Sequence, residues 1–133
     1  EIVLVTGVQT CALPISLAYI GDAVYELHIR ELLIGRNKSD VGKVHKRAVS
    51  YVSSDGQAKA IKSMMNDFLT EEEQKLVKRA RNKRATSRPK NADPRKYKIA
   101  TGFEALIGAL HMDGDETRLE EVLAEAVRII EED

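Results

Sequence analysis

The sequence predicts an all-α fold. Aromatic residues make up only 5% of the 133 residues, there is no Trp, and only three Pro are present. In several segments the apolar residues recur at the spacing of one helix face, and turn-forming residues separate these segments. A chain of this length has room for one domain with its own core.

The first 16 residues, EIVLVTGVQTCALPIS, do not fit this pattern. As a strand, residues 1–8 would have no partner in a helical chain, and as a secretory signal they lack a basic start. Their second half resembles a translated sequencing-library adapter. We therefore interpret residues 1–16 as a non-native segment and residues 17–133 as the domain; a divergent native arm is the alternative.

Two features bear on the location of the protein. Cys11 is the single cysteine, so the chain offers no intramolecular disulfide, which is consistent with a reducing, cytoplasmic environment. No apolar run reaches the length needed to span a membrane. We expect a cytoplasmic protein without a membrane partner.

The first predicted helix covers residues 17–35 and places one carboxylate, Asp22, among small and apolar neighbours. Burying a carboxylate costs several kcal/mol unless it is paired or binds a cation. Asp22 is therefore either a partly exposed residue of the first turn, where the helix dipole favours it, or a functional acid.

The middle of the chain predicts three further helices, over residues 41–52, 57–65 and 70–81, with interruptions over 35–40 and 53–56. Ser39 or Asp40 can cap the first of these helices. Thr70 and Glu73 have the spacing of a capping box, in which the hydroxyl accepts a backbone N–H bond and the carboxylate reaches back.

Residues 82–95 are predicted to form a loop, because Pro89 and Pro94 lie among other turn-forming residues. Loops of that length tend to be functional. A helix over residues 99–112, a turn over 113–115 and an amphipathic helix over 116–132 complete the chain.

The helix over 99–112 carries Glu104 away from its apolar stripe of Ile99, Phe103, Leu106, Ile107 and Leu110. Gly102, Ala105, Gly108 and Ala109 remove bulk from the rest of its surface, so that another helix can approach closely. Two such helices can bring Asp22 and Glu104 together, where the carboxylates repel each other unless a divalent cation lies between them. Oxygen ligands suit Mg²⁺ or Mn²⁺ rather than zinc.

The formal net charge is zero, but the charges are segregated along the chain. Residues 75–98 contain 11 Lys or Arg and one acid, whereas residues 113–133 contain nine acids and two Arg. The basic segment has one aromatic residue, Tyr97, and so lacks the stacking platforms of single-strand binders. Duplex RNA is contacted through phosphates and 2′-hydroxyls, for which Lys, Arg and Asn suffice. An exposed, solvated face is the alternative for the basic segment.

Two motifs, GDAVYE at residues 21–26 and GFEALIGAL at residues 102–110, resemble the ribonuclease III family, whose endonuclease domain carries a GDAVL-type motif and a later FEALIGA motif. The mini-ribonuclease III subgroup, which lacks a double-stranded-RNA-binding domain, is more similar still. It shares VHKRAVSYVSS-x-x-QA at residues 44–58, KRARN at 78–82 and RPKNAD at 88–93.

The resemblance implies the helical bundle of the ribonuclease III endonuclease domain and metal-dependent cleavage of double-stranded RNA by a homodimer. Asp22 and Glu104 are the implied catalytic and metal-binding residues, with Mg²⁺ as the cofactor and Mn²⁺ as a substitute. The implied substrate is precursor ribosomal RNA of the 23S type. The residues expected to bind RNA are Lys46, Lys78, Arg79, Arg81, Asn82, Lys83, Arg84, Arg88, Lys90 and Asn91. The dimer interface is expected on the first helix, at Tyr19, Ile20, Ala23 and Leu27.

The chain also departs from larger members of the family, which carry further acids where this sequence has Ile15, Ala18 and Thr101. A thinner acidic cluster leaves more coordination sites to water and phosphate, and leaves open whether one or two ions bind. His45 and His111 do not have the spacing of a zinc site. Because both motif acids are present, an active enzyme is favoured over a related RNA-binding protein without catalysis. A purely structural helical domain leaves the basic segment unexplained.

Overall fold

The computed structural model describes residues 13–36, 40–82 and 93–132, and in these residues the regular structure is entirely helical. The helices are α2 (Pro14–Arg36), α3 (Val41–Val52), α4 (Ser54–Asp67), α5 (Glu71–Asn82), α6 (Pro94–Asp113) and α7 (Glu116–Glu131). The all-α prediction is confirmed. None of the described helices is both long and apolar enough to cross a membrane. Residues 1–12 lie outside the described part, and the assignment of residues 1–16 as non-native stays a prediction; Pro14 to Ser16 form the first turn of α2.

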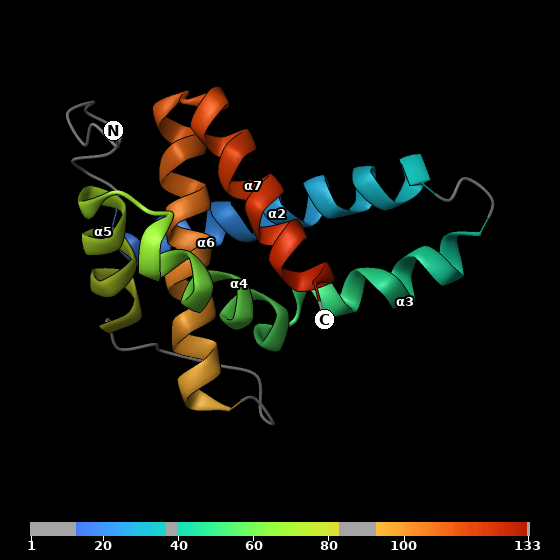
Figure 1. The fold of residues 1–133 in the computed structure, drawn as a ribbon, viewed down its shortest axis with the longest axis horizontal. Coiled ribbons are helices and arrows are strands. Elements are labelled where there is room, and N and C mark those ends of the chain that lie inside the picture. Colours follow the sequence, from blue (N-terminus) through green and yellow to red (C-terminus); the bar gives the residue numbers. More distant parts are fainter. Residues whose placement is uncertain (1–12, 37–39, 83–92, 133) are drawn as a thin grey trace.

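Helix α6 lies at the centre of the bundle, where α2, α4, α5 and α7 all pack against it (Figure 1). Between residues 100 and 110 every residue is buried except Glu104, which is half-buried. The sequence predicted one apolar stripe on this helix, but α6 is enclosed on nearly every side. Its small residues allow this, because they let neighbouring helices approach on faces that carry no large side chain.

The closest of these approaches is between α2 and α6. A Cβ atom on Gly21 would lie 1.7 Å from the backbone oxygen of Glu104, and one on Gly108 would lie 1.9 Å from the backbone oxygen of Leu17. The two backbones are therefore in direct contact, as the small residues predicted. Gly102 serves another neighbour, since a Cβ there would lie 2.9 Å from the backbone oxygen of Val77 in α5.

Two helices, α4 and α6, begin earlier than predicted, because a capping side chain sets the start of each. Ser53 ends α3, and its hydroxyl accepts the N–H of Gly56 at 3.2 Å, so α4 starts at once and the interruption predicted over 53–56 is a single residue. The loop predicted over 82–95 also ends earlier. Asp93 caps α6 and Pro94 occupies its first turn, where the missing N–H of proline costs nothing. Residues 83–92 lie outside the described residues.

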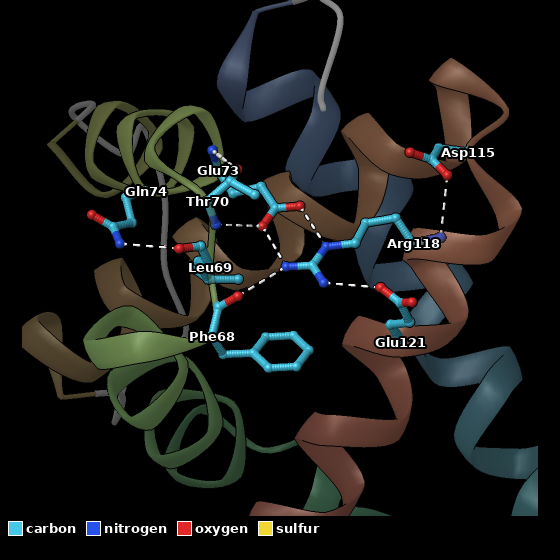
Figure 2. Close-up of polar contacts among 8 residues, drawn as sticks. All are labelled: Phe68, Leu69, Thr70, Glu73, Gln74, Asp115, Arg118 and Glu121. Carbon is cyan, nitrogen blue, oxygen red and sulfur yellow. Dashed lines mark hydrogen bonds and ion pairs between the residues drawn. The ribbon is translucent and has the colours of Figure 1, made fainter.

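The predicted capping box at the start of α5 is present and is part of a larger network (Figure 2). The Thr70 N–H donates to Glu73 Oε1 at 2.9 Å, and the Glu73 N–H donates to the Thr70 hydroxyl at 3.2 Å. Glu73 is completely buried, and Arg118 of α7 donates to both of its oxygens, at 2.7 and 2.8 Å. Arg118 also donates to the backbone oxygen of Phe68 and lies over its ring. This network fixes the first turn of α5 to α7.

Candidate active site

The acid pair predicted from the sequence lies at the crossing of α2 and α6. Asp22 is exposed and follows Gly21, the residue that touches the backbone of Glu104. Both carboxylates line one open pocket of about 240 Å³. The other residues of this pocket are Ile15, Ala18, Tyr19, Tyr97 and Thr101. The tight crossing thus brings together two acids that lie far apart in the sequence.

The electrostatics of Glu104 reflect this crowding of negative charge. The pKa of Glu104 is raised to about 8. Burial is the largest cause, and the charge of Asp22, a hydrogen bond with Asp22 and the charge of Glu26 also contribute to the rise, whereas a hydrogen bond from Gln57 opposes it. A carboxyl with such a pKa is largely protonated at neutral pH unless a cation compensates the pair.

The donor set of the pocket suits a hard divalent cation. Asp22 and Glu104 offer oxygen ligands, and the pocket has room for waters that complete an octahedral shell. In the described part of the chain no group of three or more His, Cys, Asp or Glu side chains is placed to hold a metal. Ala18 and Thr101, which stand where larger family members carry acids, line the same pocket and leave it with two carboxylates.

A larger open pocket, of about 620 Å³, lies where the ends of α2, α3, α4 and α7 meet, but its acids are already compensated. Glu131 accepts hydrogen bonds from Tyr51 and Arg36, which lower the pKa of its carboxyl. Asp55 is paired with Lys96. The smaller pocket is therefore the better candidate for a cation site, because its carboxylates have no cationic partner in the described contacts.

Gln57, at the start of α4, is a residue of this site that sequence reasoning missed. It is 2% exposed, and its Nε2 donates to Glu104 Oε2 at 3.1 Å and to the backbone oxygen of Val52 at 2.9 Å. A polar residue in helical register with the buried residues Ile61 and Met64 was the available signal, since buried amides need partners.

The predicted RNA-binding residues fall into two groups and an undescribed remainder. Lys78, Arg79 and Asn82 are exposed on α5, with Arg81 half-buried beside them. Helix α5 packs against α6 at Val77 and Gly102, close to the turn that carries Thr101 and Glu104. Exposed Lys46 lies on α3, and no extensive packing joins α3 to α5 within the described residues. Lys83, Arg84, Arg88, Lys90 and Asn91 lie outside the described residues.

The residues expected at a dimer interface lie along the exposed side of α2. Tyr19 is 83% exposed and Leu27 is 59% exposed, Ala23 is exposed and Ile20 is half-buried. Ile15 and Ile34, at 43% and 46%, extend the same run of exposed apolar side chains. The homodimer stays a prediction.

Comparison with known proteins gives consistent matches. The ribonuclease III domain model matches residues 15–115. Mini-ribonuclease 3 of Thermoanaerobacter sp. is 42% identical over 119 residues, covering 90% of this chain and 83% of the relative. Mini-ribonuclease 3 of Symbiobacterium thermophilum is 45% identical over 118 residues, covering 89% of this chain and 90% of the relative.

The fold comparison agrees. A crystal structure of a protein from Fusobacterium nucleatum superposes with a TM-score of 0.78 at 28% identity, covering 89% of this chain and 93% of that one. With the helices described above, the family match confirms the helical bundle expected from the two sequence motifs. The chain belongs to the ribonuclease III family.

Proposed function

We propose that this chain, an RNA endonuclease by its family, cleaves double-stranded RNA with a divalent cation held by Asp22 and Glu104. The observation that carries the proposal is the meeting of these two carboxylates in one pocket at the α2–α6 crossing. The raised pKa of Glu104 supports it, because the pair is electrostatically unfavourable until a positive charge is added.

Hydrolysis of a phosphodiester needs an attacking water, stabilisation of the phosphoryl oxygens and help for the leaving oxygen. Mg²⁺, or Mn²⁺ in its place, supplies these functions when bound. The protein's part is to hold Asp22 and Glu104 at a fixed separation, which the backbone contact between Gly21 and Glu104 ensures. The half-buried position of Glu104 limits its access to water and strengthens its attraction to a cation.

The basic face of α5 supports duplex RNA as the substrate. Lys78 and Arg79 project from the helix that packs beside the Glu104 turn, so a phosphate backbone lying along α5 would reach the pocket. These side chains contact phosphates without reading bases. Tyr97, the one aromatic residue of the basic segment 75–98, is half-buried, so this segment offers no open platform on which a single strand could stack.

We propose further that the enzyme acts as a cytoplasmic homodimer and that precursor ribosomal RNA is its substrate, as the resemblance to mini-ribonuclease III implies. The support for a dimer is the exposed apolar run on α2, which no other described helix covers. Substituting Tyr19 and Leu27 together by Ser should shift the molecular mass measured by light scattering from dimer to monomer. The matched control is Val49→Ser, because Val49 is an apolar residue that is 49% exposed but belongs to α3 and not to the α2 run.

The decisive experiment is incubation of long duplex RNA with the protein and Mg²⁺. The intact chain should cut the duplex and leave a single strand of the same sequence uncut, and Asp22→Asn and Glu104→Gln should each abolish cutting. Glu31→Gln makes the same carboxylate-to-amide change at an exposed position of α2 and should leave cutting intact. Duplex binding without cleavage by the intact chain would refute the enzyme and favour a binding protein.

A further inference from the structure

We propose that Gln57 is a positioning residue for metal binding: it holds one oxygen of Glu104 so that the other faces the cation. This inference rests on the function proposed above and adds a residue from a third helix, α4, to the site. It follows from the hydrogen bonds and the burial of the Gln57 amide.

The orientation of the amide is fixed by its partners. Gln57 Nε2 donates to the backbone oxygen of Val52 at 2.9 Å and to Glu104 Oε2 at 3.1 Å. A backbone carbonyl can only accept, so the amide must present its nitrogen on this side, and both of its N–H groups are used. Gln57 therefore acts toward Glu104 as a donor.

The same orientation leaves the amide oxygen without a partner. Gln57 Oε1 is the one buried side-chain polar atom in the described residues that has no hydrogen-bond partner in the protein. Gln57 is 2% exposed, so a Leu or Met at this position would bury the same volume without leaving an acceptor unpaired. The unpaired oxygen opposes folding, and the bonds to Val52 and Glu104 are the contacts that an apolar residue cannot replace.

Comparison with a second glutamine, Gln74, distinguishes the bond that Gln57 makes to Glu104 from the bond that it makes to the nearby backbone oxygen of Val52. Gln74 Nε2 donates to the backbone oxygen of Leu69, five residues earlier (Figure 2). Gln57 Nε2 donates in the same way to the backbone oxygen of Val52, also five residues earlier. Gln74 is half-buried and has no bond to Glu104 among its described contacts. The bond to a carbonyl five residues back is thus a shared device of helix starts, whereas the bond to Glu104 is particular to Gln57.

The bond has a direct consequence for the carboxylate. A hydrogen bond to Oε2 restricts rotation about the last bond of the Glu104 side chain. Oε1 would then bind the cation, which would take the place of the hydrogen bond between Glu104 and Asp22. Partners that orient metal-binding carboxylates typically change metal affinity by 10- to 100-fold when they are removed. Gln57→Met, which keeps the length and volume of the side chain, should therefore weaken Mn²⁺ binding by roughly tenfold or more.

The test is Mn²⁺ binding to the full chain without RNA, measured from the loss of the free-ion electron paramagnetic resonance signal. We expect binding by the intact chain and by Gln74→Met, binding weakened at least about tenfold in Gln57→Met, and none in Asp22→Asn. Cleavage assays add a second readout. With duplex RNA, Gln57→Met should need more Mn²⁺ for half-maximal rate, while the KM for RNA stays unchanged.

The outcomes separate this inference from the proposed function. Equal Mn²⁺ binding by the intact chain and Gln57→Met overturns the role of Gln57 and leaves the proposed function standing. Absence of Mn²⁺ binding by the intact chain overturns both. If Gln57→Met lowers the thermal unfolding midpoint more than Gln74→Met does, and raises the KM for RNA as much as the Mn²⁺ requirement, Gln57 is a packing residue and the inference fails.

Discussion

Substituting Gly21 by Ala tests whether the close crossing of α2 and α6 builds the acid pair. The added Cβ would lie 1.7 Å from the Glu104 backbone oxygen, 2.7 Å from its carbonyl carbon and 2.8 Å from the Gly108 nitrogen. Ordinary contacts of a Cβ begin near 3.4 Å, so the helices must move apart by about 1.7 Å. All three obstructing atoms are helix backbone and cannot rotate away as a side chain would.

We expect Gly21→Ala to lower the free energy of unfolding by about 3 kcal/mol, at the upper end of overpacking costs, because the backbone itself must shift. For a domain of this size the midpoint of thermal unfolding should then fall by roughly 10 °C. Since the shift also separates Asp22 from Glu104, Mn²⁺ affinity and duplex cleavage should be lost at temperatures where the variant is still folded.

Urea unfolding followed by circular dichroism measures the change, and Gly35→Ala is the control. Gly35 lies in the same helix with no atom within 4 Å of the added Cβ and without a positive φ angle, so its substitution should stabilise the helix by up to about 1 kcal/mol. A Gly21→Ala protein as stable as Gly35→Ala, with cleavage intact, would refute the account of the crossing.

Three further predictions concern pH, the buried ion pair and the basic helix. First, without metal the free energy of unfolding should fall as the pH rises from about 4.5 to about 8, because the folded protein retains the Glu104 proton over this range and the unfolded chain does not; Glu104→Gln should remove this part of the slope in urea titrations. Second, Arg118→Met leaves Glu73 buried and unpaired, and should cost about 3–5 kcal/mol of stability in the same assay. Third, Lys78→Gln should weaken binding to all duplex sequences alike and reduce the slope of log affinity against log salt by about 1 in filter-binding titrations.

Matched variants serve as controls for the second and third of these predictions. Glu121→Gln removes an exposed partner of Arg118 and should cost less than about 1 kcal/mol; a cost equal to that of Arg118→Met would contradict the special role of the buried pair. Arg128→Gln removes an exposed charge from α7 and should leave the salt dependence unchanged. If it changes the slope as much as Lys78→Gln does, binding follows overall charge rather than α5.

The sequence predicted the acid pair because two local signals coincided. Asp22 and Glu104 each stand among small residues in a motif of helical spacing, and small residues imply that a neighbour comes close. Local spacing could not show which neighbouring helix packs against which small residue. Gly21 and Gly108 face each other, whereas Gly102 accommodates Val77 of α5.

Partners distant in sequence were the other features that escaped prediction. The capping-box spacing predicts the contact of Glu73 with Thr70 in its own turn. It does not predict the contact of Glu73 with Arg118, 45 residues away. Gln57 likewise reaches Glu104 across 47 residues. The sequence predicts a loop at Pro94, because proline occurs both in loops and in the first turn of helices. The structure places Pro94 in the first turn of α6, after the cap at Asp93. Contacts of this kind depend on the packing of α4 and α7 against the rest of the bundle.

The most direct test of the central claim is anomalous X-ray scattering from crystals of the intact chain containing Mn²⁺. The account predicts a manganese peak in the pocket between Asp22 and Glu104, bound to at least one carboxylate oxygen directly and to the other acid directly or through one water. A well-ordered pocket without a manganese peak, or a peak bound elsewhere with Asp22 and Glu104 free, would contradict it.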